Sequence, residues 1–131
     1  MELIRREMPR DYTVVDCGDF HFGSINCSRK GIQEMVDRVA GDDNCYLVAK
    51  GDAIEAITPN DKRWASCAVD WQDRLYTPGD QANAIVETFK PIADKILVWL
   101  IGNHEYKLIN TEDYGRRISS ALGVPYGGTH A

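Results

Sequence analysis

Three short segments of the chain each place a side chain that could bind a metal ion, or donate a proton, directly after an apolar run. The first segment holds Asp19 and His21, the second holds Asp52, and the third holds Asn103 and His104. Oxygen and nitrogen donors in this combination suit manganese, iron or zinc better than calcium. Histidine can also give a proton to a leaving alkoxide near neutral pH. These residue types therefore predict metal-dependent phosphoester chemistry.

The local sequence indicates how each side chain would be presented. Asp19 and His21 would point to the same side of an extended backbone, with Phe20 turned inward. Gly51 permits a sharp turn after a buried strand, and the two oxygens of Asp52 can bridge cations about 3.5–4 Å apart. Each segment alone also fits an ordinary turn. All three occur in order, each after an apolar run, and chance explains that combination poorly.

Apolar runs and helical periodicity alternate along the chain, which predicts an α/β fold with a parallel sheet and crossover helices. Strands are expected over residues 11–17, 44–50 and 95–101, with another beginning within 124–126. The nearly continuous apolar run at 95–101 favours a strand that is covered on both faces. The carboxyl ends of parallel strands share one edge of the sheet, so the three segments should converge there.

Helices are expected between these strands. Ser28 would cap a helix that continues to about residue 39 and ends at Gly41. A second helix would cover residues 81–93, where Pro91 ends or bends it.

The remaining segments are less regular. Asn110 or Thr111 would cap a last helix that ends at Gly123. Residues 59–80 are expected to form a long excursion with at most a short helix, closing at the turn signal of Pro78-Gly79.

Composition bounds the class of protein. With 131 residues and a net charge of −5, the chain is expected to be a single domain without a general basic surface for nucleic acid. Bound cations would invert the sign locally and admit an anionic substrate. No apolar run approaches the roughly 18 residues of a membrane span, and the first residues lack the apolar core of a signal peptide. The four cysteines have no C-x-x-C spacing, so reduced thiols and a cytoplasmic location are expected.

The order of motifs resembles that of the calcineurin-like metallophosphoesterase superfamily, which is marked by D-x-H, then G-D-x-x-D/E, then G-N-H-E/D. Here these motifs occupy residues 19–21, 51–55 and 102–105, and the resemblance covers roughly residues 12–108. It implies that the chain forms one half of an αββα sandwich of two sheets flanked by helices. It also implies phosphatase or phosphodiesterase activity at a centre of two divalent cations, with manganese expected first and iron, zinc or nickel as alternatives.

The resemblance also implies a role for each candidate residue. Asp19 and His21 would bind the first cation, Asp52 would bridge both cations at the catalytic centre, and Asn103 would bind the second. His104 would contact the phosphate and act as the catalytic acid, while water attacks phosphorus in line.

The chain departs from the family pattern after His104. Family members bring further histidines, including a G-H-x-H segment, whereas here only His130 follows. The domain, residues 1–131, is therefore expected to be incomplete, to bind one cation well and to be a weak catalyst alone. One face of its sheet would stay uncovered, which favours a homo-oligomer, or a completing segment or partner chain.

Two other functions remain open. The chain could be a non-catalytic half-domain that binds a partner through the uncovered sheet face. It could also be a metal-dependent nuclease, in which residues 62–64 (Lys-Arg-Trp) stack on a base, although the acidic composition weakens that alternative. Metal-dependent hydrolysis of an aryl phosphate would separate the enzyme from the binding module.

Overall fold

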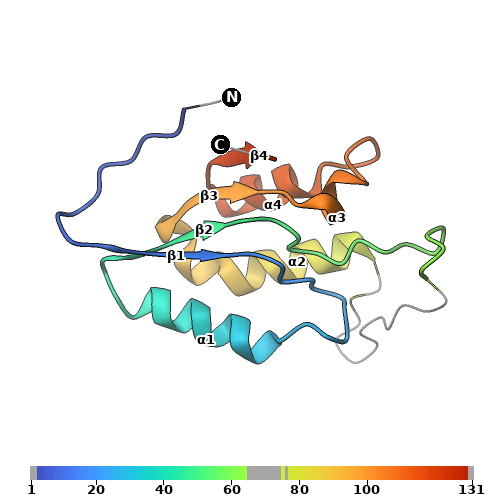
Figure 1. The fold of residues 1–131 in the computed structure, drawn as a ribbon, viewed down its shortest axis with the longest axis horizontal. Coiled ribbons are helices and arrows are strands. Elements are labelled where there is room, and N and C mark those ends of the chain that lie inside the picture. Colours follow the sequence, from blue (N-terminus) through green and yellow to red (C-terminus); the bar gives the residue numbers. More distant parts are fainter. Residues whose placement is uncertain (1–2, 65–74, 76, 130–131) are drawn as a thin grey trace.

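The computed structural model describes residues 3–64, 75 and 77–129. Helices and strands alternate along the described chain (Figure 1). The elements, in chain order, are β1 (Thr13–Cys17), α1 (Arg29–Ala40), β2 (Cys45–Ala49), α2 (Pro78–Phe89), the 3₁₀ helix η1 (Lys90–Lys95), β3 (Ile96–Leu100), α3 (Asn103–Tyr106), α4 (Tyr114–Leu122) and β4 (Tyr126–Gly128).

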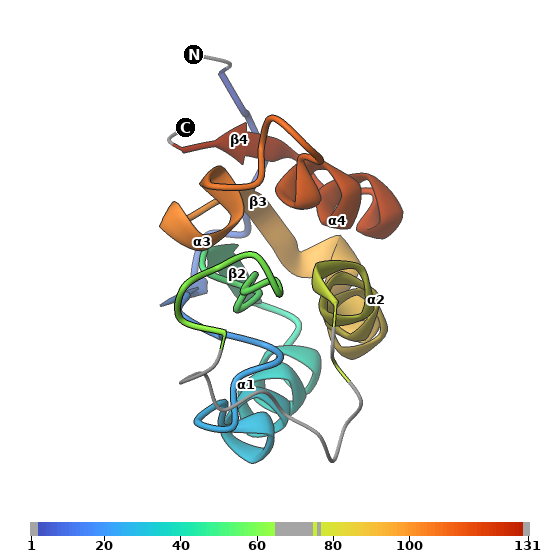
Figure 2. The ribbon, with the colours of Figure 1, turned by 90° about the vertical axis from the view of Figure 1, so that its right-hand side faces the viewer.

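The four strands form one parallel sheet in the order β1-β2-β3-β4. This confirms the predicted parallel sheet with crossover helices. Because each connection moves one strand further in the same direction, crossovers of one hand all pass over the same face. Helices α1, α2 and α4 accordingly lie on one side of the sheet (Figure 2).

The core lies between the sheet and these three helices. The side chains of Leu47 and Ala49 in β2 and of Trp99 in β3 are fully buried there. Phe89 at the end of α2 links the layers, because its ring packs 5.4 Å from the Trp99 ring and 5.1 Å from that of Phe20. Phe20 is 4% exposed, as predicted for a side chain turned inward.

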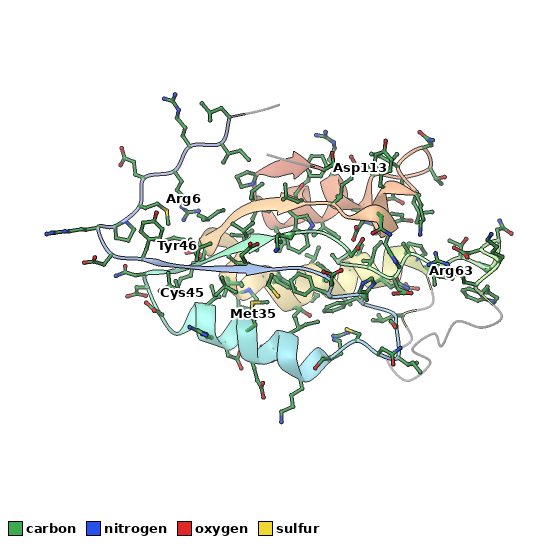
Figure 3. All side chains as sticks on the ribbon, in the orientation of Figure 1. Arg6, Met35, Cys45, Tyr46, Arg63 and Asp113 are labelled. Atoms are coloured by element: carbon green, nitrogen blue, oxygen red, sulfur yellow. The ribbon has the colours of Figure 1, made fainter. Side chains whose placement is uncertain are left out.

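The opposite face of the sheet is only partly covered. Val14 is 40% exposed, and its neighbours across the sheet, Tyr46 and then Val48 and Val98, are half-buried. Arg6 from the N-terminal segment reaches over the Tyr46 ring, with its guanidinium carbon 5.3 Å from the ring centroid (Figure 3). The prediction that the strand within 95–101 is covered on both faces was therefore wrong. All three crossover helices pack on a single face.

The predicted ends of α1 are confirmed, and those of α2 are confirmed only in part. The Ser28 side chain accepts a hydrogen bond from the backbone of Gly31, and Gly41 follows the last turn. Helix α2 begins at Pro78 rather than at residue 81. Pro78-Gly79 is thus not a closing turn, since proline is favoured in the first turn of a helix and Thr77 caps it. The α-helix ends at Phe89 rather than at residue 93, and Pro91 lies in the 3₁₀ helix η1 that follows, in line with the predicted end or bend there.

The last helix is capped by Asp113, not by Asn110 or Thr111 as predicted. One Asp113 oxygen accepts from the backbone of Arg116, at 2.9 Å, and both accept from the Tyr126 hydroxyl (Figure 3). Burial, together with this bond to Asp113, raises the pKa of Tyr126 to about 12. Asp113 therefore ties β4 to α4.

The excursion before α2 is described only at its start and end. Arg63 in the segment that favoured a nuclease pairs with Asp61 at 2.8 Å, and its hydrogen bonds hold the pKa of Asp61 well below its usual range. The predicted short helix within 59–80 falls largely on residues 65–74, and His130 also lies outside the described residues. None of the helices in the described part of the chain has the length and apolar character needed to cross a membrane.

Candidate metal centre

The loops that follow β1, β2 and β3 meet at the carboxyl edge of the sheet, the edge that faces the viewer in Figure 2. They form two overlapping groups of side chains in which the ligand atoms all lie within 4.8 Å of one another. The first group is Asp19, His21 and Asp52, and the second is His21, Glu55 and His104. The predicted convergence of the three segments is thus observed for four of the five candidate residues.

Strained backbone aims several of these side chains. Asp19, His21 and Asp52 have φ values of 55°, 49° and 47°, in the left-handed region that L-residues avoid. Such a conformation costs about 1–3 kcal/mol per residue and is retained where the surrounding structure enforces it, commonly at functional sites. The prediction of an extended backbone at residues 19–21 was wrong. The loop is instead held against the next one, since Asp19 and His21 donate to the carbonyls of Gly51 and Asp52 at 3.0 and 2.9 Å.

Two glycines let the β2 and β3 loops approach each other. A Cβ atom on Gly51, which has φ 93°, would lie 2.2 Å from the Gly102 nitrogen. A Cβ atom on Gly102 would lie 2.1 Å from Oδ1 of Asp52. No side chain fits at either position. The glycine before Asp52 and the glycine before Asn103 therefore serve the same close contact, which brings the Asp52 carboxylate against the start of α3.

The buried carboxylate of Glu105 joins these two loops. Glu105 is 2% exposed, and its two oxygens accept four backbone hydrogen bonds from both loops. The donors and distances are Ala53 at 2.6 Å, Ile54 at 3.0 Å, Asp52 at 3.1 Å and Gly102 at 3.0 Å. Glu105 thus satisfies amide groups that a tight loop leaves without strand partners. It positions Asp52 without contacting the open side of the site.

The first group has a geometry that suits a divalent cation. Oδ1 of Asp19 lies 3.7 Å from Nε2 of His21, and two donors about 2.1 Å from one ion can be at most about 4.2 Å apart. The Asp19 side chain is 83% exposed, so solvent or a substrate can reach this position. The Asp52 carboxylate stands beside them and also accepts from the backbone of His104 at 2.9 Å. Two carboxylates and an imidazole fit manganese, iron or zinc.

The second group orients the two histidines. Oε2 of Glu55 lies 2.9 Å from Nδ1 of His21, although the pair is poorly aligned and this buried nitrogen has no hydrogen bond within the described residues. The backbone carbonyl of Glu55 lies 2.5 Å from Nδ1 of His104. A carbonyl can only accept, so Nδ1 of His104 carries a proton and Nε2 is left for other partners. The two imidazoles meet edge to face, with ring centroids 4.6 Å apart.

Asn103 is the remaining predicted ligand, and its amide is a different kind of donor from the imidazoles and carboxylates that make up the two groups. It is the first residue of α3 and is exposed, and it lines a hollow together with Tyr106 and Thr129. Its neighbours on both sides contact Asp52 directly. Asn103 therefore lies next to the centre, on the side that faces α3 and the end of β4.

No role was predicted for Glu55 or Glu105, although both lie within the motifs at residues 51–55 and 102–105. Glu55 comes three residues after Asp52, and Glu105 directly follows His104. The pattern of acidic residues at these spacings was thus visible. The roles of these residues depend on the conformation of the loops, which their spacing does not predict. The loops turn Glu55 toward the histidines and bury Glu105 beneath them.

Glu55→Gln is expected to weaken Mn²⁺ binding or hydrolysis by about 10–100-fold, the usual cost of losing a carboxylate that orients a metal-binding histidine. Glutamine removes the negative charge that lies 2.9 Å from Nδ1 of His21, while the contact of the backbone carbonyl with His104 remains. Calorimetric titration with Mn²⁺ would measure the change. Glu87→Gln on α2 is the matched control and should leave the affinity unaltered. An affinity equal in Glu55→Gln and the unmodified protein would contradict the orienting role.

Comparison with protein-family models, with curated proteins and with solved structures found no significant match to this chain.

Proposed function

We propose that the chain is a metal-dependent phosphoester hydrolase whose cation is held by Asp19, His21 and Asp52. The observation that carries the proposal is the convergence of these donors, from two separate loops, within 4.8 Å of one another. Strained φ values at all three residues support it, because conformations that cost free energy are commonly retained at functional sites. His104 lies next to this group and supplies a group that can transfer a proton.

A bound divalent cation supplies Lewis acidity toward a phosphoryl oxygen and toward water. The chain supplies the rest. Asp19 and His21 orient one side of the substrate position, and Asp52 is fixed from behind by its own backbone bond to Glu105. His21 presents Nε2 toward Asp19 and Nδ1 toward Glu55, so the nitrogen that faces away from the cation has a carboxylate nearby.

His104 is placed to protonate the leaving group. Its side chain is 12% exposed, and its Nδ1 is bound to the Glu55 carbonyl. In the imidazolium form, Nδ1–H stays on that carbonyl and Nε2–H is directed to another acceptor. A leaving alkoxide beside the cation would be that acceptor. General acid catalysis of this kind needs a donor with a fixed orientation. The contact of Nδ1 with the Glu55 carbonyl orients the ring, and the backbone bond of His104 to Asp52 fixes the position of the residue.

Mn²⁺ is expected to bind the chain at one tight site. The first position offers Asp19, His21 and Asp52, whereas a second position next to Asp52 has only Asn103 as an additional predicted ligand. Asp19→Asn should therefore weaken the tight site by more than tenfold, since a charged donor becomes neutral. Calorimetric titration at neutral pH measures both the stoichiometry and the affinity.

Asp16→Asn is the control for this titration, because Asp16 precedes Asp19 by three residues but pairs with Lys50 at 3.3 Å. Its affinity should match that of the unmodified protein. Two tight sites on a single chain would contradict the ligand count, and no Mn²⁺ binding would remove the basis of the proposed activity. Hydrolysis of 4-nitrophenyl phosphate, with and without a chelator, then tests the reaction itself.

A binding module without catalysis is the second candidate. The partly covered face of the sheet favours it, because Val14 is exposed and Tyr46, Val48 and Val98 are only half-buried. Mn²⁺ that binds without any hydrolysis of an aryl phosphate would favour this candidate over the enzyme.

A further inference from the structure

A hollow of about 380 Å³ opens directly beside the candidate metal centre. It lies between α3 and the residue that follows β4, at the carboxyl edge of the sheet. Its lining residues are Ile101, Gly102, Asn103, Tyr106 and Thr129. None of the three residues proposed to hold the cation, Asp19, His21 and Asp52, lines this hollow.

The hollow and the centre share a wall. Gly102 lines the hollow, and a Cβ atom on this residue would lie 2.1 Å from Oδ1 of Asp52. Asn103, next along the chain, also lines the hollow and is followed by His104, whose backbone donates to Asp52. If the phosphoryl group of a substrate lay at the cation, its organic group could therefore reach the hollow.

The chemistry of the walls limits what would enter. None of the lining residues that the structure describes carries a charge, so these residues offer no counter-ion to a second phosphate or to an ammonium group. Tyr106 supplies an aromatic ring that is 56% exposed, a large apolar side chain left in solvent next to a catalytic centre. A cavity of about 150 Å³ can hold benzene. A hollow of about 380 Å³ thus has room for a substituted ring or a bicyclic one.

We propose that this hollow binds the uncharged ring of an aryl or nucleoside phosphoester, with Tyr106 stacking on it, and so selects ring-bearing substrates over small alkyl ones. The inference rests on the proposed hydrolase function, because it assigns the organic part of the same substrate. Tyr106 acts here as a specificity-determining residue.

The test uses phenylphosphonate and methylphosphonate, which cannot be hydrolysed, on the full chain loaded with Mn²⁺. Phenylphosphonate is expected to bind about tenfold more tightly than methylphosphonate. Tyr106→Ala should remove this preference and Tyr106→Phe should retain it. Tyr12→Ala is the matched control, because Tyr12 is a tyrosine of similar exposure (51%) that precedes β1 at the other end of the sheet. Equal affinity for the two phosphonates in the unmodified protein would overturn the proposal.

A second measurement keeps this proposal separate from the hydrolase function. Saturation-transfer NMR with benzyl alcohol, in the presence of a chelator, reports on the hollow when no cation and no phosphoryl group contribute. A signal that falls in Tyr106→Ala but not in Tyr12→Ala would support the ring site even if the chain proved inactive. A signal that is identical in both variants would refute it, even if the chain hydrolysed phosphoesters.

Discussion

Replacing His104 with alanine is expected to lower kcat for phenyl phosphate by about 10²–10⁴-fold, the usual contribution of a positioned general acid. Mn²⁺ affinity should change little, because the bond that His104 makes to Asp52 comes from its backbone and survives the substitution. The loss should be much smaller for 4-nitrophenyl phosphate, whose leaving group needs less protonation. Steady-state kinetics with both substrates measure the difference.

Asp52→Asn is the contrasting variant. It removes a charge from the centre, so both substrates should lose hydrolysis to the same degree and Mn²⁺ affinity should fall with it. If His104→Ala lowered kcat equally for the two substrates, His104 would be acting on the phosphoryl group or on the fold rather than as the acid. Thermal unfolding of both variants checks the fold independently.

Replacing Glu105 with alanine is expected to lower the free energy of unfolding by about 3–5 kcal/mol, because several backbone donors lose their acceptor at once. The four backbone donors that Glu105 satisfies would lose their acceptor, and those of Ala53 and Ile54 lie in buried residues. Each buried donor left without a partner costs about 1–3 kcal/mol. Chemical denaturation would measure the loss, and Tm should fall by about 10 °C or more.

Glu34→Ala is the control for this experiment. Glu34 lies on α1 with its side chain 67% exposed and pairs with Lys30 at 3.7 Å, so its loss should cost less than about 0.5 kcal/mol. Glu105→Gln should fall between the two, because the amide keeps one acceptor oxygen but turns an NH₂ group toward backbone donors. Equal stability of Glu105→Ala and Glu34→Ala would show that the two loops do not depend on this carboxylate.

The fold was largely predictable because apolar runs mark the strands of a parallel sheet directly. The ends of the helices were less predictable. Asn110, Thr111 and Asp113 are all good N-caps within four residues, and local sequence cannot choose among them. Asp113 is selected by the Tyr126 hydroxyl, which arrives from β4 through the fold.

The candidate site was predictable in its residue types but not in its geometry. Asp19 and His21 adopt positive φ because their backbone amides bond to the loop after β2, a contact that no local pattern encodes. Glu55 acts on His104 through a backbone carbonyl, so the identity of its side chain carries no record of that role. Sequence motifs thus identified which residues meet, while the pairing of loops determined what each one faces.

The strand order determines which loops at the carboxyl edge of the sheet can contribute to the same site. Neighbouring strands are about 4.8 Å apart, so the end of β4 stands roughly 14 Å from that of β1. A loop from β2 can touch both flanking loops, and Asp52 and Glu55 both come from it. The tip of β4 is too distant to share an ion with Asp19, yet it borders the hollow at Thr129. The candidate metal centre therefore lies at one flank of the sheet, and we expect substitutions at the other flank to alter the hollow without changing the cation ligands.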